Sequence, residues 1–199
     1  TGTSNIFEVQ RGRNSVEIDL EKIINVESVQ FDPESGEVDY GTNVTLSCDT
    51  IGAQILYKLD GADGWTEGNA SSVTITIKND VTIFAKAKVG NMDSDENEAK
   101  YIVKYKVQFE KNGGNLNLTD DITVTSKNSV PLSAINPIKT GYDFKGWYLD
   151  SDFDDETKKY TVSSGDATEG VIKLYAKWEA ITYTVVFNPN GGTGSMNSQ

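Results

Sequence analysis

Histidine is absent from the sequence, and cysteine occurs once, as Cys48. Without histidine the chain cannot form a Ser-His-Asp triad, a histidine-ligated metal site or a histidine general base. A lone cysteine also excludes a disulfide within the chain and a cysteine-rich metal site. Because Cys48 alternates with Leu46 and Val44, we interpret it as a small buried hydrophobe.

Basic residues are few: the chain has 18 Lys and Arg against 30 Asp and Glu, a net charge of −12. This charge disfavours nucleic acids and anionic membranes as partners, because both would be repelled. No stretch approaches the roughly 20 apolar residues of a membrane-spanning helix. Residues 1–4 show no signal-peptide pattern, so we expect the sequence to begin inside a longer protein.

A repeat organises the second half of the sequence. The segment 105–109, Tyr-Lys-Val-Gln-Phe, returns as Tyr-Thr-Val-Val-Phe at 183–187, and Asn112-Gly113-Gly114 returns 78 residues later at 190–192. A fixed period indicates a repeat array. It predicts one full repeat over 104–180, and over 181–199 the first strand of a second repeat that the end of the sequence cuts off.

The Asn-Gly dipeptides of this repeat favour tight turns with positive φ angles. A phosphate-binding loop is the alternative, but no Gly-Lys-Ser/Thr follows and no helical pattern comes after the glycines. We therefore interpret Asn112-Gly113 and Asn190-Gly191 as turns.

The first half alternates apolar and polar residues in short runs between turn signals. Two runs within residues 1–25 predict a hairpin, or the end of a preceding domain. Further runs at 44–48, 55–59, 73–77 and 81–87 predict a β-sandwich over residues 26–103. No Gly/Ser linker separates residues 103 and 105, so we expect a short and stiff junction.

Three segments of the first half carry a resemblance: 38–44, 52–61 and 83–87. They look like the chitobiase/β-hexosaminidase C-terminal type domain over residues 28–103. The resemblance implies a small immunoglobulin-like sandwich that serves as an accessory in secreted enzymes or surface proteins. Lys58 stands where that family usually has Thr, a change at an exposed strand position.

The second half resembles the Listeria–Bacteroides repeat, or internalin B-repeat, over residues 104–199. The residues that carry it are Phe109, Asn112-Gly113-Gly114, Gly141-Tyr142, Phe144, Gly146-Trp147-Tyr148 and Leu174-Tyr175-Ala176-Lys177-Trp178. The resemblance implies a β-grasp-like, ubiquitin-like fold that occurs in tandem on bacterial surface proteins. The stretch 120–133 is longer and more polar than the family pattern.

Aromatic residues of the repeat allow two interpretations, a hydrophobic core or a sugar-stacking platform. In a regular strand Tyr142, Phe144 and Tyr148 share one face, and Trp147 faces oppositely unless Gly146 marks a bulge. Because aromatics supply most of the area available for burial in this part of the chain, we favour the core and predict that Trp147 and Trp178 are buried. The full set is Tyr142, Phe144, Trp147, Tyr148, Tyr175 and Trp178.

Two acidic runs, 150–156 and 93–98, contain residue types that could bind a metal or catalyse hydrolysis. An EF-hand loop that begins at Asp150 needs Gly in sixth place and Glu in twelfth, where the sequence has Asp155 and Thr161. The run 93–98 is interpreted as a solvated loop. A glycosidase needs two carboxylates about 5–9 Å apart across a cleft, for which short loops leave little room. We therefore predict no catalytic, cofactor-binding or metal-binding residues.

Together these observations predict a mainly β, non-enzymatic fragment of a secreted bacterial surface protein. An immunoglobulin-like β-sandwich is followed by a β-grasp-like repeat, and the region acts as a stalk or spacer, or as an adhesion module. The alternative is a carbohydrate-binding accessory region of a polysaccharide-degrading enzyme. Expected partners are proteins or glycans on host or neighbouring cells. Residues 181–187 are expected to favour strand-mediated self-association.

Overall fold

The computed structural model describes residues 25–68, 70–118, 121–186, 188 and 190–193. Within these ranges the chain is built of β-strands and two short 3-10 helices, η1 (Asp155–Thr157) and η2 (Ser164–Asp166). The prediction of a mainly β chain is confirmed. Neither helix in the described ranges has the length and apolarity needed to cross a membrane. The hairpin predicted for residues 1–25 lies, except for its last residue, outside the described residues.

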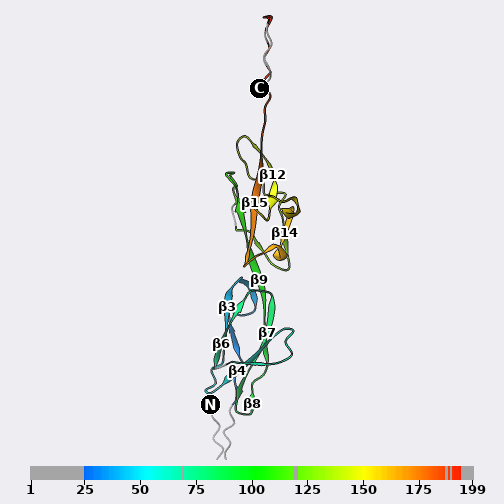
Figure 1. Ribbon diagram of the computed structural model, residues 1–199. Helices are drawn as coiled ribbons and strands as arrows, with labels where there is room; N and C mark the ends of the chain where they lie inside the picture. The colour runs from blue at the N-terminus through cyan, green and yellow to red at the C-terminus, as the bar shows by residue number, and fades with distance from the viewer. Residues whose placement is uncertain (1–24, 69, 119–120, 187, 189, 194–199) are drawn as a thin grey trace, which may run out of the picture.

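Two facing sheets form the N-terminal half, as the predicted immunoglobulin-like sandwich requires (Figure 1). One sheet has the order β1-β3-β6, with β1 (Gln30–Asp32), β3 (Thr42–Ser47) and β6 (Ser72–Ile77). The other contains β2 (Gly36–Asp39), β4 (Gln54–Leu59), β5 (Thr66–Glu67), β7 (Val81–Val89), β8 (Met92–Asp93) and the first part of β9 (Asn97–Glu110).

The core of this sandwich follows the predicted alternation. Val44, Leu46 and Cys48 are all buried, as are Ile83, Ala85 and Ala87 along β7. Because successive side chains of a strand point to opposite faces, such spacing puts one row inside and leaves the other in water. The interpretation of Cys48 as a buried residue is confirmed.

Strand β9 runs through both halves of the molecule (Figure 1). Its first residues pair with β7, and residues 101–104 pair in parallel with β2. From residue 105 the partners change to β10 (Thr123–Val124) and, from residue 106, to β15 (Val171–Ala180). The boundary predicted between residues 103 and 104 therefore lies inside one strand that carries ladder partners on both sides of that point.

The repeat half is arranged around the parallel pair of β9 and β15. β12 (Tyr142–Tyr148) pairs with the other edge of β15, and β13 (Lys158–Lys159) pairs with β12. A separate two-stranded sheet, β11 (Ser129–Pro131) with β14 (Thr161–Ser163), completes the domain. The two lobes lie end to end along one axis in Figure 1.

Gly146 interrupts the regular register of β12. Phe144 pairs with Trp178, and Gly146 pairs with the next residue of β15, Lys177, so the strand carries a bulge between residues 144 and 146. A bulge shifts the side chains beyond it to the opposite face. Phe144 and Trp147 consequently both pack against the core, as the bulge alternative required.

The stretch 120–133, which departs from the family pattern, contains β10 and β11. The described residues of the repeat form no α-helix over its sheet, so the β-grasp arrangement stays a prediction. The turn at Asn112-Gly113 is confirmed: both residues have positive φ, 47° and 83°, and the amide of Gly114 donates to the carbonyl of Lys111.

Residues 181–186 leave the end of β15 without joining a strand (Figure 1). At the first of these residues, the amide of Ile181 donates to the carbonyl of Gly141 at 2.9 Å. Tyr183 is 78% exposed and Val186 is 80% exposed. The strand addition expected for 181–187 therefore does not occur within this chain over residues 181–186. Pairing with another chain stays a prediction.

Candidate functional site

The contact between the two lobes is the site with the most specific geometry among the described residues. Tyr40, in the turn after β2, points from the sandwich toward the repeat, and its hydroxyl donates to Glu169 Oε2 at 2.9 Å. Its ring lies 6.1 Å from the ring of Tyr105, centroid to centroid. Its amide donates to the carbonyl of Lys104 in β9, which fixes the turn against the shared strand.

Gly170 is the surface on which the Tyr40 ring rests. Its φ angle is +84°, and an added Cβ would lie 2.6 Å from two ring atoms of Tyr40. Real atoms do not approach so closely, and side-chain-bearing residues rarely adopt this backbone conformation. Only glycine satisfies both conditions here, so the turn 169–170 and Tyr40 fit as a matched pair.

Polar contacts surround this aromatic contact. Lys78 Nζ lies 4.0 Å from Glu169 and 5.8 Å from the centre of the Tyr40 ring. Asp80 Oδ1 accepts from the amide of Val103 in β9, and its other oxygen accepts from the hydroxyl of Ser126. The sandwich thus holds both the shared strand and the repeat through one loop, residues 78–80.

Two tyrosine pKa values reflect this environment. The hydrogen bond to Glu169 raises the pKa of Tyr40, and burial and the charge of that carboxylate act in the same direction. Burial is the main cause that raises the pKa of Tyr105, with smaller effects of Asp80 and Tyr40. Both phenols therefore stay protonated at neutral pH and act as hydrogen-bond donors.

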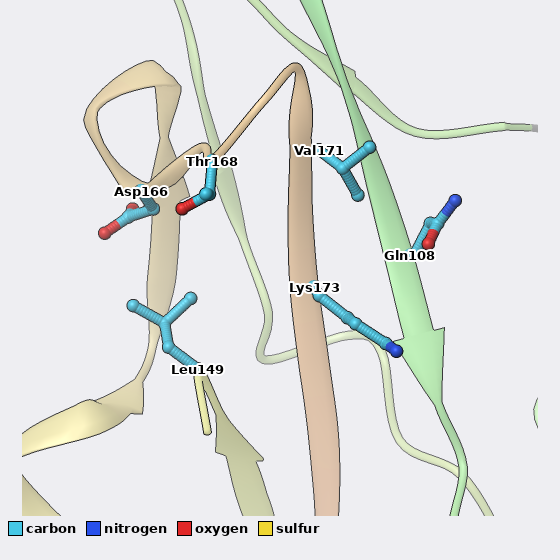
Figure 2. A pocket seen from close by; sticks show the side chains of 6 residues that line it. All are labelled: Gln108, Leu149, Asp166, Thr168, Val171 and Lys173. Carbon is cyan, nitrogen blue, oxygen red and sulfur yellow. The ribbon is translucent and has the colours of Figure 1, made fainter. Parts of the chain in front are cut away.

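A pocket of about 500 Å³ lies next to this junction, on the repeat (Figure 2). Lys173 of β15 and Gln108 of β9 line one side, and Asp166 and Thr168 line the other. Figure 2 shows Asp166 and Lys173 pointing apart. One carboxylate, Asp166, is present among the six lining residues, whereas acid–base hydrolysis of a glycoside needs two.

The charges of this pocket are already neutralised within the chain. Asp166 lies 2.6 Å from Lys159 Nζ and also accepts from the amide of Ser163. Burial raises the pKa of Asp166, but the contacts with Lys159 and Ser163 outweigh burial, so the net shift is downward. Lys173 pairs with Glu110 at 3.2 Å. Asp166 therefore stabilises its own loop, and Lys173 and Glu110 join β15 to β9.

The aromatic residues of the repeat form a core and its edge. Trp147 is 1% exposed, and its Nε1 donates to the carbonyl of Ile135 at 2.7 Å, so its predicted burial is confirmed. Trp178 is half-buried, which corrects the prediction of full burial. Its ring covers Gly114 at the core edge, its centre lies 5.4 Å from that of Phe144, and its Nε1 donates to the carbonyl of Lys111.

A sugar-stacking platform would need exposed rings in one plane. The aromatic pairs within the described residues have interplanar angles of 45° to 88°, so none of those pairs is coplanar. Trp65 on the sandwich is half-buried, and Lys58 and Lys86 place their amino groups 4.6 and 5.0 Å from its centre. Lys58, at which the sequence departs from the family pattern, thus contacts the face of the Trp65 ring.

The acidic loops satisfy their own backbone. Asp150 Oδ1 accepts from the amides of Asp152 and Asp154, and a hydrogen bond from the Thr157 side chain is the main cause that lowers the pKa of Asp150. In the run 93–98, Asp93 lies in β8 and pairs with Lys86 at 2.6 Å, which lowers the pKa of Asp93, and residues 97 and 98 belong to β9, so the predicted loop is limited to residues 94–96. Among the described residues no cluster of three or more potential ligands is placed to hold a metal.

The junction residues were not identified from the sequence as a site. Tyr40 and Glu169 are 129 positions apart, and each belongs to an ordinary turn. The one available signal was the short connection between residues 103 and 105, which predicted a stiff junction but none of the contacting side chains.

Family comparisons agree with this division. The two halves of the chain match two different family models. Residues 33–99 match the chitobiase/beta-hexosaminidase C-terminal domain, and residues 105–177 match the Listeria-Bacteroides repeat domain. Both predicted resemblances are confirmed. The matched domains are an accessory C-terminal domain and a repeat domain, and neither is a catalytic domain.

Two curated relatives come from the bacterium Evansella cellulosilytica. One, named "Putative Gly-rich membrane protein", is 29% identical over 85% of this chain and 18% of its own length. The other, named "Putative membrane protein", is 32% identical over 59% of this chain and 15% of its own length. The chain therefore spans less than a fifth of these relatives.

Proposed function

We propose that this region is a non-catalytic spacer in a secreted bacterial surface protein, holding an immunoglobulin-like domain and a repeat domain in one fixed relation. The observation that carries the proposal is the continuity of β9 across both lobes. A flexible linker lets two domains reorient, whereas a strand that is hydrogen-bonded on both sides of the boundary resists bending.

Side-chain contacts at the junction add to this stiffness. Three contacts fix the rotation of the repeat about the strand axis. The Tyr40 ring packs on Gly170, the Tyr40 hydroxyl bonds to Glu169, and Asp80 bridges β9 to Ser126. Small domains that contact their neighbours in series form an extended array, the architecture expected of a spacer. The accessory and repeat types of the matched domains, and the names of the relatives, support a place on the cell surface.

Pulsed-EPR distances across the junction test the proposal. Spin labels are attached through Thr74→Cys on the sandwich and Ser151→Cys on the repeat, both exposed positions, in a Cys48→Ala background. A spacer predicts one narrow distance distribution. Tyr40→Ala and Gly170→Ala should broaden it, because both remove the matched contact. Tyr160→Ala is the matched control, since Tyr160 is 74% exposed and takes no part in the junction contacts.

A broad distribution in the parent protein would reject the spacer. The proposal would also be rejected if the Tyr40 and Gly170 variants kept the narrow distance distribution, because the junction contacts would then not set the relation between the two domains. Binding to a glycan array that is lost on Trp65→Ala would instead favour the carbohydrate-binding alternative.

A further inference from the structure

The far end of the repeat resembles the sandwich end of the first junction. At the first junction, the strand leaving the sandwich is tied to a tyrosine turn, since Tyr40 donates its amide to Lys104. At the far end, the chain leaving β15 is tied to another tyrosine turn, where Ile181 donates its amide to Gly141, next to Tyr142. Each turn therefore places a tyrosine beside the exit of a strand.

A lysine accompanies each of these tyrosines. Lys78 Nζ lies 5.8 Å from the Tyr40 ring centre, and Lys139 Nζ lies 4.3 Å from that of Tyr142. Tyr183 corresponds to Tyr105 in the 78-residue repeat, so both ends also carry a tyrosine on the outgoing segment.

The two ends differ in what covers them. Tyr40 and Tyr105 are half-buried at the junction, whereas Tyr142 is 41% exposed and Tyr183 is 78% exposed. Ile138, whose backbone bonds to Asn115 near this tip, is 77% exposed. Exposed apolar side chains gathered in one place mark an interaction surface more often than single ones do.

Charge indicates the kind of partner. Lys78 is paired with Glu169, while Lys139 Nζ donates to the carbonyl of Asn112 at 2.9 Å and has no acidic side chain within 4.0 Å among the residues that the structure describes. The Lys139 amino group beside the partly exposed Tyr142 ring favours a partner that carries an acidic group. The partner also needs a glycine, against which the Tyr142 ring can pack. The turn Glu169-Gly170 supplies both features at the first junction.

We propose that the tip formed by Ile138, Lys139, Tyr142, Ile181 and Tyr183 is a docking surface for a following repeat domain. That domain presents its own counterpart of the Glu169-Gly170 turn to Tyr142 and Lys139. The inference rests on the proposed spacer function and extends it. Both junctions then use the same arrangement, in which a tyrosine and a lysine contact a Glu-Gly turn of the following domain. Residues 183–192 repeat the sequence pattern of 105–114, so a following repeat begins at the position that this geometry requires.

A fusion protein tests the docking: residues 1–182 continue directly into a second copy of residues 105–180. With Cys48→Ala, one pair of spin labels spans the first junction, at Thr74→Cys and Ser151→Cys. A second pair, at Ser151→Cys in both copies, spans the new junction. We expect narrow distance distributions for both pairs. Tyr142→Ala in the first copy should at least double the width at the new junction and leave the first junction unchanged.

Two further variants keep this test decisive. Gly170→Ala in the second copy alone should broaden the new junction, because it blocks the docking of Tyr142. Tyr160→Ala in the first copy should leave both distributions narrow, and thermal melts confirm that each variant folds. A broad new junction beside a narrow first junction would overturn the docking surface and leave the spacer intact. If both junctions are broad, the spacer fails as well.

Discussion

Both cores are mainly aliphatic, but the repeat packs a connected chain of four aromatic rings with its buried aliphatic residues, whereas in the two facing sheets of the sandwich the fully buried Tyr101 lies among aliphatic side chains. Ring centres lie 4.8 Å apart for Phe109 and Trp147, 5.3 Å for Phe144 and Trp147, and 5.4 Å for Phe144 and Trp178. In the sandwich the buried area is divided among many residues, among them Val29, Val44, Leu46, Ile55, Ile77 and Ile83.

This difference changes how each domain responds to a single substitution. An indole buries more area than any aliphatic side chain, so the repeat loses a larger share of its stability when Trp147 is removed than the sandwich loses when one aliphatic residue is removed. The two cores are connected through β9, because the same strand contributes Tyr101 to the core of the sandwich and Val107 to the core of the repeat. The variants below test whether the two cores respond separately despite this shared strand.

Trp147→Ala should have the largest effect, about 3–5 kcal/mol on the unfolding of the repeat. The substitution leaves a cavity beside Phe109 and Phe144 and leaves the carbonyl of Ile135 without its donor. Urea unfolding followed by circular dichroism measures the loss, and hydrogen exchange shows where it occurs. We expect faster exchange over 105–180. Tyr160→Ala is the control, at about 1 kcal/mol or less, since its side chain is 74% exposed. Equal effects of the two variants would contradict the aromatic core.

Ile55→Ala makes the reverse change in the sandwich. Ile55 is fully buried, and its truncation should cost about 2–5 kcal/mol. Exchange should quicken in residues 44–103 and stay slow at Leu174 and Ala176 of the repeat. If exchange accelerates equally in both halves, the shared strand couples the cores and they unfold as one unit.

Trp178→Ala should cost less than Trp147→Ala, about 2 kcal/mol. The Trp178 side chain is already partly exposed, so less apolar area is lost, and one hydrogen bond to Lys111 is removed. The same urea titration compares the two tryptophans directly. A loss as large as that of Trp147→Ala would restore the sequence-based prediction that both are core residues.

Asp166→Asn should lower the stability of the repeat by about 1 kcal/mol at pH 7, since the carboxylate bonds to Lys159 and Ser163. Folding lowers the pKa of Asp166, so its contribution is fully present above the unfolded value of about 3.9. That contribution is lost as the pH falls through the lower folded pKa. Melting temperatures of parent and variant should therefore converge at low pH; a constant difference would show that charge is not involved.

Calcium should have the smallest effect, no change in melting temperature. Asp150 already accepts hydrogen bonds from the backbone of its own loop. Melts with calcium and with a chelator should coincide for the parent protein. A rise of several degrees with calcium would contradict the prediction that the protein has no metal site, because such a shift requires selective binding to the folded state. Asp150→Asn would then locate the ion.

The sequence by itself determined the main strands of the sandwich, the turn at Asn112-Gly113 and the resemblance of the two halves to two kinds of domain. Period-two alternation placed Val44, Leu46 and Cys48 inside because a strand's geometry repeats every two residues. Asn112-Gly113 predicted its turn because these residues tolerate positive φ. Such signals are local, so they need no knowledge of what lies across the fold.

Tertiary structure alone decided the face of Trp147, the partial exposure of Trp178 and the junction. The sequence offered Gly146 as a bulge only as an alternative, and the pairing of β12 with β15 decided it. The contact of Tyr40 with Glu169 and Gly170 joins residues about 130 positions apart. It exists because β9 continues from one sheet into the next and sets the rotation of the repeat, and no local pattern in the chain encodes that angle.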